Sequence, residues 1–464
     1  MRGAGLGMAA AALVAACGAG GASGAEAPAL AAGGAAAATA GAPRVIALDE
    51  ALAMARERAP AAIRARGDVR AGRAQVRSAL GAFLPNLTLS AGSTRSWPEG
   101  EVTRIVDGEQ RRFSAPRWSY GASLSSSVEL FAGGRRLFEL RQARAQLDAA
   151  EAGAVAGLFG VDLAVKAAYF DVLAARESEA AARAQLAQAE LQRRTAVARL
   201  RAARATKSDS LRAEIQVGNA TLAVLQARQD IATAEAALAR VIGSPQPVTA
   251  ADEPPAAREA AALDEAAIAR LAAEGPAVAE ARAQRDAARA AARAAWTDYL
   301  PSLSASYSRS GSGTGQETLF GEDDLFAYNG SLRLSLSLPV FDRFAREAQA
   351  VSASVALDNA EAALRDAELA ARESVVRDLG ALRTAEERER VQTASVAAAE
   401  EDLRAQQRRY ELGESTLLDV LTSQTQLDEA RQALIRARYD RRVALAQLEA
   451  LVGRSLAGGE PARP

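Results

Sequence analysis

The sequence predicts a mainly helical protein with a few amphipathic β-strands, built from two copies of one helix–strand–strand–long helix–helix unit. Alanine supplies much of the 49% hydrophobic content, which is typical of long helices with closely packed seams. Two stretches alternate apolar residues with serine at a period of two, as in "SLRLSLSLPVF" at 331–341, which indicates strands. Finally, landmark proline, phenylalanine and glycine residues recur at a fixed offset along the chain.

The recurring landmarks predict an internal duplication. "AFLPNLTLSAG" at 82–92 resembles "DYLPSLSASYS" at 298–308, and another proline lies 25 residues before the proline of each. Further on, the offset is 210 for the pairs Phe131/Phe341, Asp209/Asp419, Leu211/Leu421 and Gly243/Gly453. Chance similarity between alanine-rich helices does not keep such landmarks in step. We expect the copies at 44–242 and 263–453, an inter-repeat linker at 243–262 and a C-terminal tail at 454–464.

The chain begins with a stretch typical of a secretory signal peptide. "MRGAGLGMAAAALVAAC" has one arginine, a short apolar run and small residues before Cys17, and this run is too short to span a bilayer. Either the signal is cleaved within the alanine run and Cys17 is incidental, or residues 14–17 resemble a bacterial lipobox. We expect Cys17 to carry an acyl group such as palmitate, because the only cysteine falls there. Residues 1–16 are then the signal and 17–43 a flexible tether.

In the first copy we expect a helix at 61–83, ending before Pro85, and strands near 86–97 and 118–130. The proline-free stretch from 135 to about 203 predicts a helix about 100 Å long. After a break at "RATKS", we expect Ser208 or Asp209 to cap a helix that ends at Ile242. Four- and three-residue steps in that helix predict a coiled-coil seam, formed by Leu211, Ile215, Gly218, Leu222, Leu225, Gln229, Ala232 and Ala236.

The second copy repeats this plan. We expect a helix at 277–299, strands near 302–309 and 327–338, a long helix at about 344–412 with Gly413 at its end, and a helix at 417–452. No segment after the signal is long and apolar enough for a transmembrane helix.

Composition argues against several functions. The formal net charge of −1 gives no electrostatic case for a nucleic-acid partner or an anionic membrane surface. The chain has no histidine and one cysteine, so ordinary zinc, Ser-His or Cys-His sites cannot be built. No constellation of carboxylates suggests acid–base chemistry. We therefore expect no enzyme, no metal and no cofactor.

The strands have features of a membrane β-sheet. They are about as long as the 9–11 residues that a tilted bilayer-crossing strand needs, with one apolar and one serine-rich face. Of the 20 aromatic residues, 13 fall within 83–131 and 296–341, where interfacial aromatic residues would lie. A soluble antiparallel sheet covered by helices would alternate in the same way. Four strands in lipid cannot close a barrel, so the membrane interpretation requires several chains.

The two-copy layout, the "FLPNL" and "YLPSL" turns, "SLSLPVFDRFAR" and "RYELGESTLLDVLTSQTQL" resemble the TolC-like outer-membrane efflux factors over essentially all of 44–453. The resemblance implies a homotrimer in which each chain gives four strands to one twelve-stranded outer-membrane β-barrel, continued by a periplasmic α-helical barrel. It also implies a tripartite pump, with a periplasmic adaptor (membrane fusion) protein and an inner-membrane transporter.

The same resemblance places the periplasmic entrance at the helix–helix turns 199–211 and 409–421, which would dock the adaptor. The family pattern is intact in the second turn as Arg409, Tyr410 and Gly413, whereas the first turn has Arg199 and Ala203. Docking through the first turn is therefore less well supported by the motif than docking through the second.

The resemblance further assigns Asp209, Asp419 and Tyr410 to a periplasmic gate. Two positions depart from the family: Ser415 stands where the latch arginine is expected, and Thr422 where a second ring aspartate is expected. Alternatively, Asp209 and Thr416 only cap helices.

The main functional prediction is a passive outer-membrane exit duct for small molecules such as drugs, energised by an inner-membrane pump of the resistance-nodulation-division type. The lipobox supports this pump class. Two alternatives remain open: a duct for type I protein secretion, and a lipid-tethered periplasmic coiled-coil scaffold with no transport role.

Overall fold

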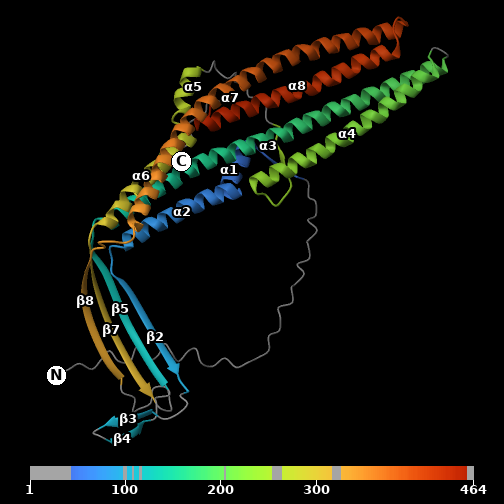
Figure 1. Cartoon of the computed structure of the whole chain (residues 1–464). Helices are drawn as coiled ribbons and strands as arrows, with labels where there is room; N and C mark the ends of the chain where they lie inside the picture. The colour runs from blue at the N-terminus through green and yellow to red at the C-terminus, as the bar shows by residue number, and fades with distance from the viewer. Residues whose placement is uncertain are drawn as a thin grey trace. The chain divides into compact units, whose positions relative to one another are not determined.

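The structure is a computed structural model that describes residues 43–97, 102–106, 109–113, 118–202, 205–252, 264–315 and 326–456 (Figure 1). Cys17 and Ala203 lie outside these residues. Within the described segments, none of the helices combines the length and the apolar character needed to cross a membrane.

The two halves carry the same order of main elements. The first half has α2 (Pro60–Gly81), β2 (Asn86–Arg95), β5 (Trp118–Ala132), α3 (Arg135–Arg201) and α4 (Lys207–Ile242). The second half has α6 (Pro276–Ala295), β7 (Ser302–Gly315), β8 (Phe326–Ser337), α7 (Ala345–Leu412) and α8 (Leu417–Val452). The long helices α3 and α7 have 67 and 68 residues, and α4 and α8 have 36 each.

Several smaller elements were not predicted. A parallel pair joins β1 (Arg44–Ile46) to β6 (Val248–Ala250), and α1 (Leu48–Arg58) and α5 (Glu265–Ala272) are additional helices. A hairpin of β3 (Val102–Val106) and β4 (Glu109–Phe113) lies between β2 and β5. The 3₁₀ turn η2 (Trp296–Tyr299) follows α6, and β7 runs to 315 rather than 309.

The helices form a layer in which α2, α3 and α4 of the first half lie beside α6, α7 and α8 of the second half (Figure 1). In the part next to the sheet, α3 packs between α2 and α6, and α6 packs against α7. Farther from the sheet, α3 packs between α4 and α8, and α8 packs against α7. Consequently α2 and α4 follow one another along one edge of the layer, and α7 runs along the other edge.

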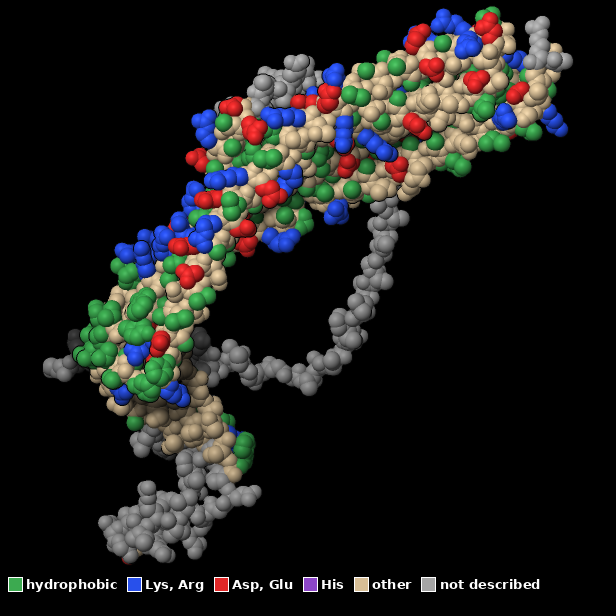
Figure 2. Space-filling model, turned by 45° about the horizontal axis from the view of Figure 1, so that its top comes forward, with side chains coloured by type: hydrophobic (Ala, Val, Ile, Leu, Met, Phe, Trp, Pro, Cys, Tyr) green, Lys and Arg blue, Asp and Glu red, His purple; other side chains and the backbone are tan. Residues whose placement is uncertain are grey.

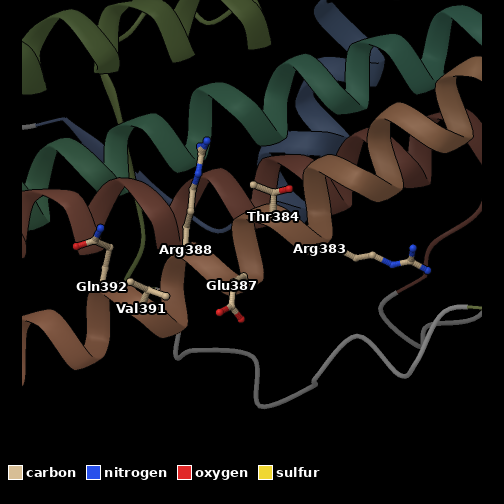
Figure 3. Close-up of a pocket in the computed structure, with 6 residues that line it drawn as sticks. All are labelled: Arg383, Thr384, Glu387, Arg388, Val391 and Gln392. Carbon is tan, nitrogen blue, oxygen red and sulfur yellow. The ribbon is translucent and has the colours of Figure 1, made fainter.

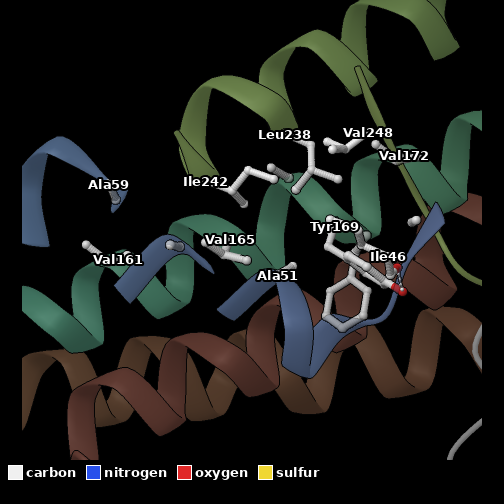
Figure 4. Close-up of a cluster of buried hydrophobic side chains, with 14 of the residues drawn as sticks. Ile46, Ala51, Ala59, Val161, Val165, Tyr169, Val172, Leu238, Ile242 and Val248 are labelled. Atoms are coloured by element: carbon white, nitrogen blue, oxygen red, sulfur yellow. Dashed lines mark hydrogen bonds between the residues drawn. The ribbon is translucent and has the colours of Figure 1, made fainter. Parts of the chain in front are cut away.

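The largest buried cluster joins α1 and the β1–β6 pair to the middle of α3 (Figure 4). Tyr169 is fully buried there, and its hydroxyl donates to the carbonyl oxygens of Ile46 at 3.2 Å and Ala251 at 3.0 Å. At the edge of the cluster, Arg56 of α1 forms a bidentate pair with Asp162 of α3, at 3.0 and 2.5 Å. These contacts attach α1 and β1 to α3 of the helix layer.

The four long strands form an antiparallel sheet in the order β2-β5-β7-β8. Its register keeps apolar residues opposite one another, as in Leu89↔Leu124 and Ala305↔Leu334. Serines likewise face serines, with hydroxyl pairs at 2.7 Å between Ser90 and Ser123 and at 2.9 Å between Ser308 and Ser331. The predicted separation into an apolar face and a serine face therefore extends across all four strands.

The apolar face is not covered by the described helices. Leu332, Leu334 and Leu336 of β8 are 66–74% exposed, and Leu87 and Leu89 of β2 are equally open. A soluble sheet covered by helices, the alternative left open by the sequence, would bury this face. Within the described residues, β2 and β8 also pair on one side only, so both edges of the sheet present free backbone groups.

The turns from strand to long helix differ between the halves. Gly133 and Gly134 adopt φ angles of +58° and +84° before α3. The equivalent positions before α7, 210 residues on, are Arg343 and Phe344, which adopt φ angles of +59° and +64°. Left-handed conformations are unfavourable for residues with a Cβ, so the second turn is strained where the first is not.

The predicted seam of α4 does not pack on α3. The positions of α4 that are buried include Ala213, Ala220, Val224 and Ala227, which face α3. Leu211, Ile215, Leu222 and Leu225 are instead 55–66% exposed. The predicted seam positions are therefore not the ones that pack on α3, because small residues allow the closer approach to α3 and leave the larger ones outside. The sequence named no partner for this seam, and a seam with another chain stays a prediction.

Candidate functional site

The candidate site is the pair of helix–helix turns at the ends of α3–α4 and α7–α8. Both turns end in the same reciprocal capping box. Thr206 caps α4, and the carboxylate of Asp209 accepts hydrogen bonds from the Thr206 amide at 3.0 Å and hydroxyl at 2.7 Å. Thr416 and Asp419 repeat this arrangement at the start of α8, with distances of 2.8 and 2.7 Å.

This geometry corrects one prediction and confirms another. The N-cap of α4 is Thr206 and not Ser208 or Asp209, because the Thr206 hydroxyl accepts the Asp209 amide and leaves Asp209 at the third helical position. Thr416 is the N-cap of α8, as predicted. The signal for Thr206 was present in the sequence, since Thr206 and Thr416 are separated by the same 210-residue offset as the other landmarks.

Asp419 is exposed and Asp209 is partly exposed, and both carboxylates are ionised at neutral pH. Hydrogen bonds from the hydroxyl and then the amide of Thr206 lower the pKa of Asp209. The equivalent hydrogen bonds from Thr416 lower the pKa of Asp419. A carboxylate in the first turn also lies at the positive end of the helix dipole. Each capping box therefore holds one carboxylate charge in place through hydrogen bonds to its threonine.

The two turns are tied together by Arg199 of α3. Its Nη1 atom donates to the carbonyl oxygen of Tyr410 at 3.0 Å, and its guanidinium carbon lies 4.2 Å from the centroid of the Tyr410 ring. Tyr410 also packs against the apolar cluster of Leu403, Val420 and Leu427 beneath the tip. A hydrogen bond and a cation–π contact thus join the end of α3 to the end of α7.

The α7–α8 turn is closed by local backbone chemistry. Gly413 adopts φ +82° as the C-cap of α7, as predicted from the sequence, and Glu414 donates its amide to the Arg409 carbonyl at 2.8 Å. Ser415, where the resembled family has an arginine, donates its hydroxyl to the Gln406 carbonyl at 3.3 Å. Thr422 donates its hydroxyl to the Leu418 carbonyl within α8.

A cavity of 240 Å³ lies beside the Arg199–Tyr410 contact. It is bounded by α3, α7 and α8, and both amide atoms of Gln192, one of its lining residues, are buried without a hydrogen-bond partner. Leu417 and Val420 of α8 close its floor and are almost fully buried. The cavity at the tip is therefore lined by buried apolar residues of α8 and by polar residues of α3, including Gln192 and Arg199.

The other hollows are weaker candidates for a functional site. Figure 3 shows a hollow of 380 Å³ on α7, lined by Arg383, Thr384, Glu387, Arg388, Val391 and Gln392. All six belong to one helix, and Arg383 reaches away from the others to Glu265 of α5 at 3.5 Å. Among the described residues, no cluster of three or more acidic, histidine or cysteine side chains is arranged to hold a metal ion.

The structure thus brings together part of the residue set predicted for the tips. Arg199 and Tyr410 are in contact, and Asp209 and Asp419 each interact with their own capping threonine. Arg409 contributes a backbone carbonyl to the turn at Gly413. The sequence did not predict the pairing of Arg199 with Tyr410, which are 211 residues apart.

Comparison with known proteins decides the family. The model of the outer membrane efflux protein family matches residues 51–244 and 267–454, which is most of the chain. The chain belongs to this family. The resemblance inferred from the sequence motifs is confirmed.

Individual members of the outer membrane efflux protein family agree with this assignment. Protein CyaE of Bordetella pertussis is 30% identical over 428 residues, covering 90% of this chain and 86% of CyaE. The outer membrane efflux protein BepC of Brucella suis is 28% identical over 292 residues, covering 63% of this chain and 62% of BepC. The open-state structure of the Neisseria gonorrhoeae outer membrane channel MtrE superposes with a TM-score of 0.68 at 23% identity, covering 88% of this chain and 89% of MtrE. The family and its solved members are channels and not enzymes.

Proposed function

We propose that this protein is a homotrimeric outer-membrane duct through which small molecules such as drugs leave the cell. The observation that carries the proposal is the sheet, which has an uncovered leucine face and two unpaired edges. Unpaired backbone groups cost several kcal/mol each in lipid, so β2 and β8 need partners there. Pairing β8 of one chain with β2 of the next supplies them and closes twelve strands from three chains.

The two faces of the sheet then meet different environments. The face that carries Leu332, Leu334 and Leu336 contacts outer-membrane lipid, and the face that carries Ser90, Ser123 and other serines lines water. Aromatic side chains cluster where the strands meet the helices, including the exposed Trp296, Phe341 and Phe344. Such residues belong at the boundary between hydrocarbon and water.

The exposed stripe of α4 supports the same assembly in the helical part. Leu211, Ile215, Leu222 and Leu225 lie at the edge of the layer opposite to α7. In a closed trimer this edge faces α7 of the neighbouring chain, where the exposed apolar residues nearer the tip include Val391 and Leu412. Association would bury both stripes and continue the barrel as a periplasmic helical tube.

The tips of this tube would form the periplasmic entrance. Asp209 and Asp419 would form rings of carboxylates, with Tyr410 held by Arg199 beside them. We propose that the turns around Arg199, Ala203, Arg409, Gly413 and Thr416 dock a periplasmic adaptor protein, and that an inner-membrane pump, of the resistance-nodulation-division type, supplies the energy.

The domain boundaries given by the sequence analysis are part of the proposal, including acylation of Cys17 and a tether at 17–43. The efflux assignment is supported by the description of the family and by the name of the outer membrane efflux protein BepC. A periplasmic scaffold would have no use for an open leucine face on a four-stranded sheet. The same duct architecture would also serve protein secretion.

Reconstitution of the full-length protein tests this proposal. We expect a trimer in outer-membrane fractions that resists SDS and dissociates on heating, and ion-conducting steps in planar bilayers. A protein that stays in the soluble fraction as a coiled-coil assembly, without conductance, would support the scaffold instead. Expression beside candidate adaptors and pumps in an efflux-deficient strain, with small-molecule and protein cargo compared, separates efflux from secretion.

A further inference from the structure

The helices α2 and α6 carry a group of arginines that forms a positively charged surface. The described helix α2 carries five arginines and one acidic residue. Four of these arginines follow one another at four- and three-residue steps, which places them on one face: Arg66, Arg70, Arg73 and Arg77. On α6, Arg282, Arg289 and Arg293 occupy the positions equivalent to Arg66, Arg73 and Arg77, at the 216-residue offset of Pro60 and Pro276. We call these seven residues the arginine face.

The arginine face lies on the same side of the helix layer as α1. Arg73 bonds Glu151 of α3 at 3.2 Å. Glu151 lies eleven residues, or about three helical turns, before Asp162, which is paired with Arg56 of α1. Glu151 and Asp162 therefore share one face of α3, and the arginines of α2 are on the side to which α1 is attached.

The opposite side of the layer is different in character. A hollow of 490 Å³ there is lined mainly by small residues of α2 and α3, with Arg64, Asp68, Glu280 and Gln284 at its edge. On α6, Gln284 faces this hollow, whereas Arg282 is two residues away and points to the other side. The excess of positive charge is therefore confined to one side. Figure 2 shows Lys and Arg side chains, with some Asp and Glu among them, over the helices next to the sheet.

Most of the arginine face is available to a partner. All four arginines of α2, together with Arg282 and Arg293, are exposed. Two of the α2 arginines have internal contacts, since Arg66 bonds backbone carbonyls of Glu57 and Ala62 and Arg73 bonds Glu151. On α6, Arg289 pairs with Glu361 at 3.1 Å. The remaining cations can pair with external anions, and guanidinium groups match carboxylates in bidentate geometry.

The length of the arginine face favours an extended polymer over a lipid headgroup layer as the partner. Arg66 and Arg77 are eleven residues apart, which corresponds to about 16 Å along α2. A lipid headgroup layer is only about 5–8 Å thick, so a membrane surface would meet one end of the face and leave the rest unpaired. A polymer with repeated carboxylates, running beside the helices, can contact all of it.

We propose that the arginine face binds the carboxylate-bearing peptide stems of the periplasmic cell-wall polymer and so holds the duct laterally. The inference rests on the proposed function, because only the trimeric duct places this side of the layer outside, in the periplasm. Three chains then present three such faces around one tube, which strengthens weak individual contacts through multivalency.

Co-sedimentation with purified peptidoglycan sacculi tests the proposal. The variant Arg70→Gln/Arg77→Gln/Arg282→Gln/Arg293→Gln removes four cations that form no ion pair with another described residue, and it keeps good helix formers. We expect its affinity for sacculi at low salt to fall by about tenfold or more, since each exposed pair contributes modestly. Binding of the unmodified protein should also be lost at about 0.5 M salt.

The matched control is Arg194→Gln/Arg201→Gln/Arg212→Gln/Arg436→Gln, which removes the same charge from exposed sites far along the helices. We expect this control to bind sacculi like the unmodified protein. Equal binding by the two variants would overturn the proposal. Conductance and SDS-resistant trimers are measured on the same samples, so a failure of the duct itself is recognised separately.

A second measurement needs no variant. Amidation of the carboxyl groups of the sacculi should abolish binding of the unmodified protein. Unchanged binding to amidated sacculi would overturn the proposal. So would stronger binding to phosphatidylglycerol vesicles than to sacculi, because that result would assign the arginine face to a lipid surface.

Discussion

Arg199 of α3 holds Tyr410 of α7 in two ways, through a hydrogen bond of 3.0 Å to its carbonyl oxygen and a ring contact of 4.2 Å. The hydrogen bond fixes the backbone just before the turn at Gly413, and the ring contact fixes the side chain. Because α3 and α7 belong to different halves of the chain, this contact couples the two tips that the proposed entrance needs. Ser415, where the family resemblance led us to expect a latch arginine, donates its hydroxyl to the Gln406 carbonyl of α7.

We predict that Arg199→Gln loosens the tip and raises the conductance of the channel in planar bilayers. Loss of the cation–π contact and of a charged hydrogen bond should cost about 1–2 kcal/mol at this part-buried site. Tyr410→Leu should act in the same direction, because it removes the ring and keeps the carbonyl. The control is Arg201→Gln, an exposed neighbour at the end of α3. Conductance that is equal in all three variants would show that the contact does not restrict the entrance.

Particular elements show which parts of the fold can be predicted from the sequence and which cannot. The bounds of α8 were predicted correctly, because Thr416 and Gly453 are local signals at its two ends. The faces of the strands were predicted because alternation is local as well. The pairing of β1 with β6 was missed, since each strand has three residues and Arg44 pairs with Val248, far away in the chain.

The errors at the candidate site have similar causes. Thr206 was missed as a cap although it repeats Thr416, because the first turn lacks the glycine that marks the second. No partner was predicted for the seam of α4, since periodicity identifies a face but not what covers it. The contact of Arg199 with Tyr410 depends on the packing of α3 against the second half, which no local pattern encodes.

The two faces of the sheet can be tested with a matched pair of substitutions. Leu334→Arg places a charge on the proposed lipid side, at a cost of about 2–4 kcal/mol near the bilayer midplane. Ser335→Arg places the same charge on the serine face, two residues from Arg333. We expect the first variant to lose SDS-resistant trimers and the second to assemble normally with altered conductance. Equal assembly defects would contradict the face assignment.

Acylation of Cys17 is a separate prediction. In Cys17→Ser, we expect no incorporation of labelled palmitate and accumulation of a precursor of higher mass. Efflux should persist, because the β-sheet would hold the trimer in the membrane without the lipid. Labelling of Cys17→Ser at the level of the unmodified protein would show that Cys17 is not the acceptor.

Burial raises the pKa of Asp428, a residue of α8 whose Oδ2 atom is buried without a hydrogen-bond partner. The Gln424 side chain donates to Oδ1 at 3.0 Å, and Arg431 and Gln185 oppose the shift. The folded state therefore binds this proton more tightly than the unfolded chain. Its stabilising contribution is complete below the unfolded pKa and is lost as the pH rises through the raised folded pKa.

Asp428→Asn should therefore raise the thermal unfolding midpoint at pH 7.5 and change it much less at pH 4. Since the carboxyl is still partly solvated, we expect a gain well below about 1.4 kcal/mol. Asp230→Asn is the matched control, because Gln226 donates to Asp230 at 2.9 Å with the same spacing on the exposed surface of α4. A stabilisation of Asp428→Asn that is the same at both pH values would exclude titration of Asp428 as its cause.

The capping boxes link helix stability to the charge of the proposed entrance. In a trimer, three Asp419 carboxylates near one axis would attract cations and select against anions. Asp419→Ala should weaken cation selectivity and block by divalent cations without loss of trimers. Wild-type selectivity and block in Asp419→Ala trimers would reduce Asp419 to a helix-capping residue.

The pH dependence separates these two roles of Asp419. Hydrogen bonds from Thr416 lower its pKa, so its charge and its capping contribution are present above the unfolded pKa and are lost only as the pH falls through the lower folded value. Thr416→Ala removes the hydroxyl hydrogen bond, which is the largest cause of the shift. We therefore expect Thr416→Ala channels to lose cation selectivity at a higher pH than unmodified channels, and the cap itself to lose about 1 kcal/mol. Reversal potentials recorded in a salt gradient between pH 3 and pH 7 measure the change in selectivity, and identical titration of the two proteins would show that this carboxylate does not set the selectivity.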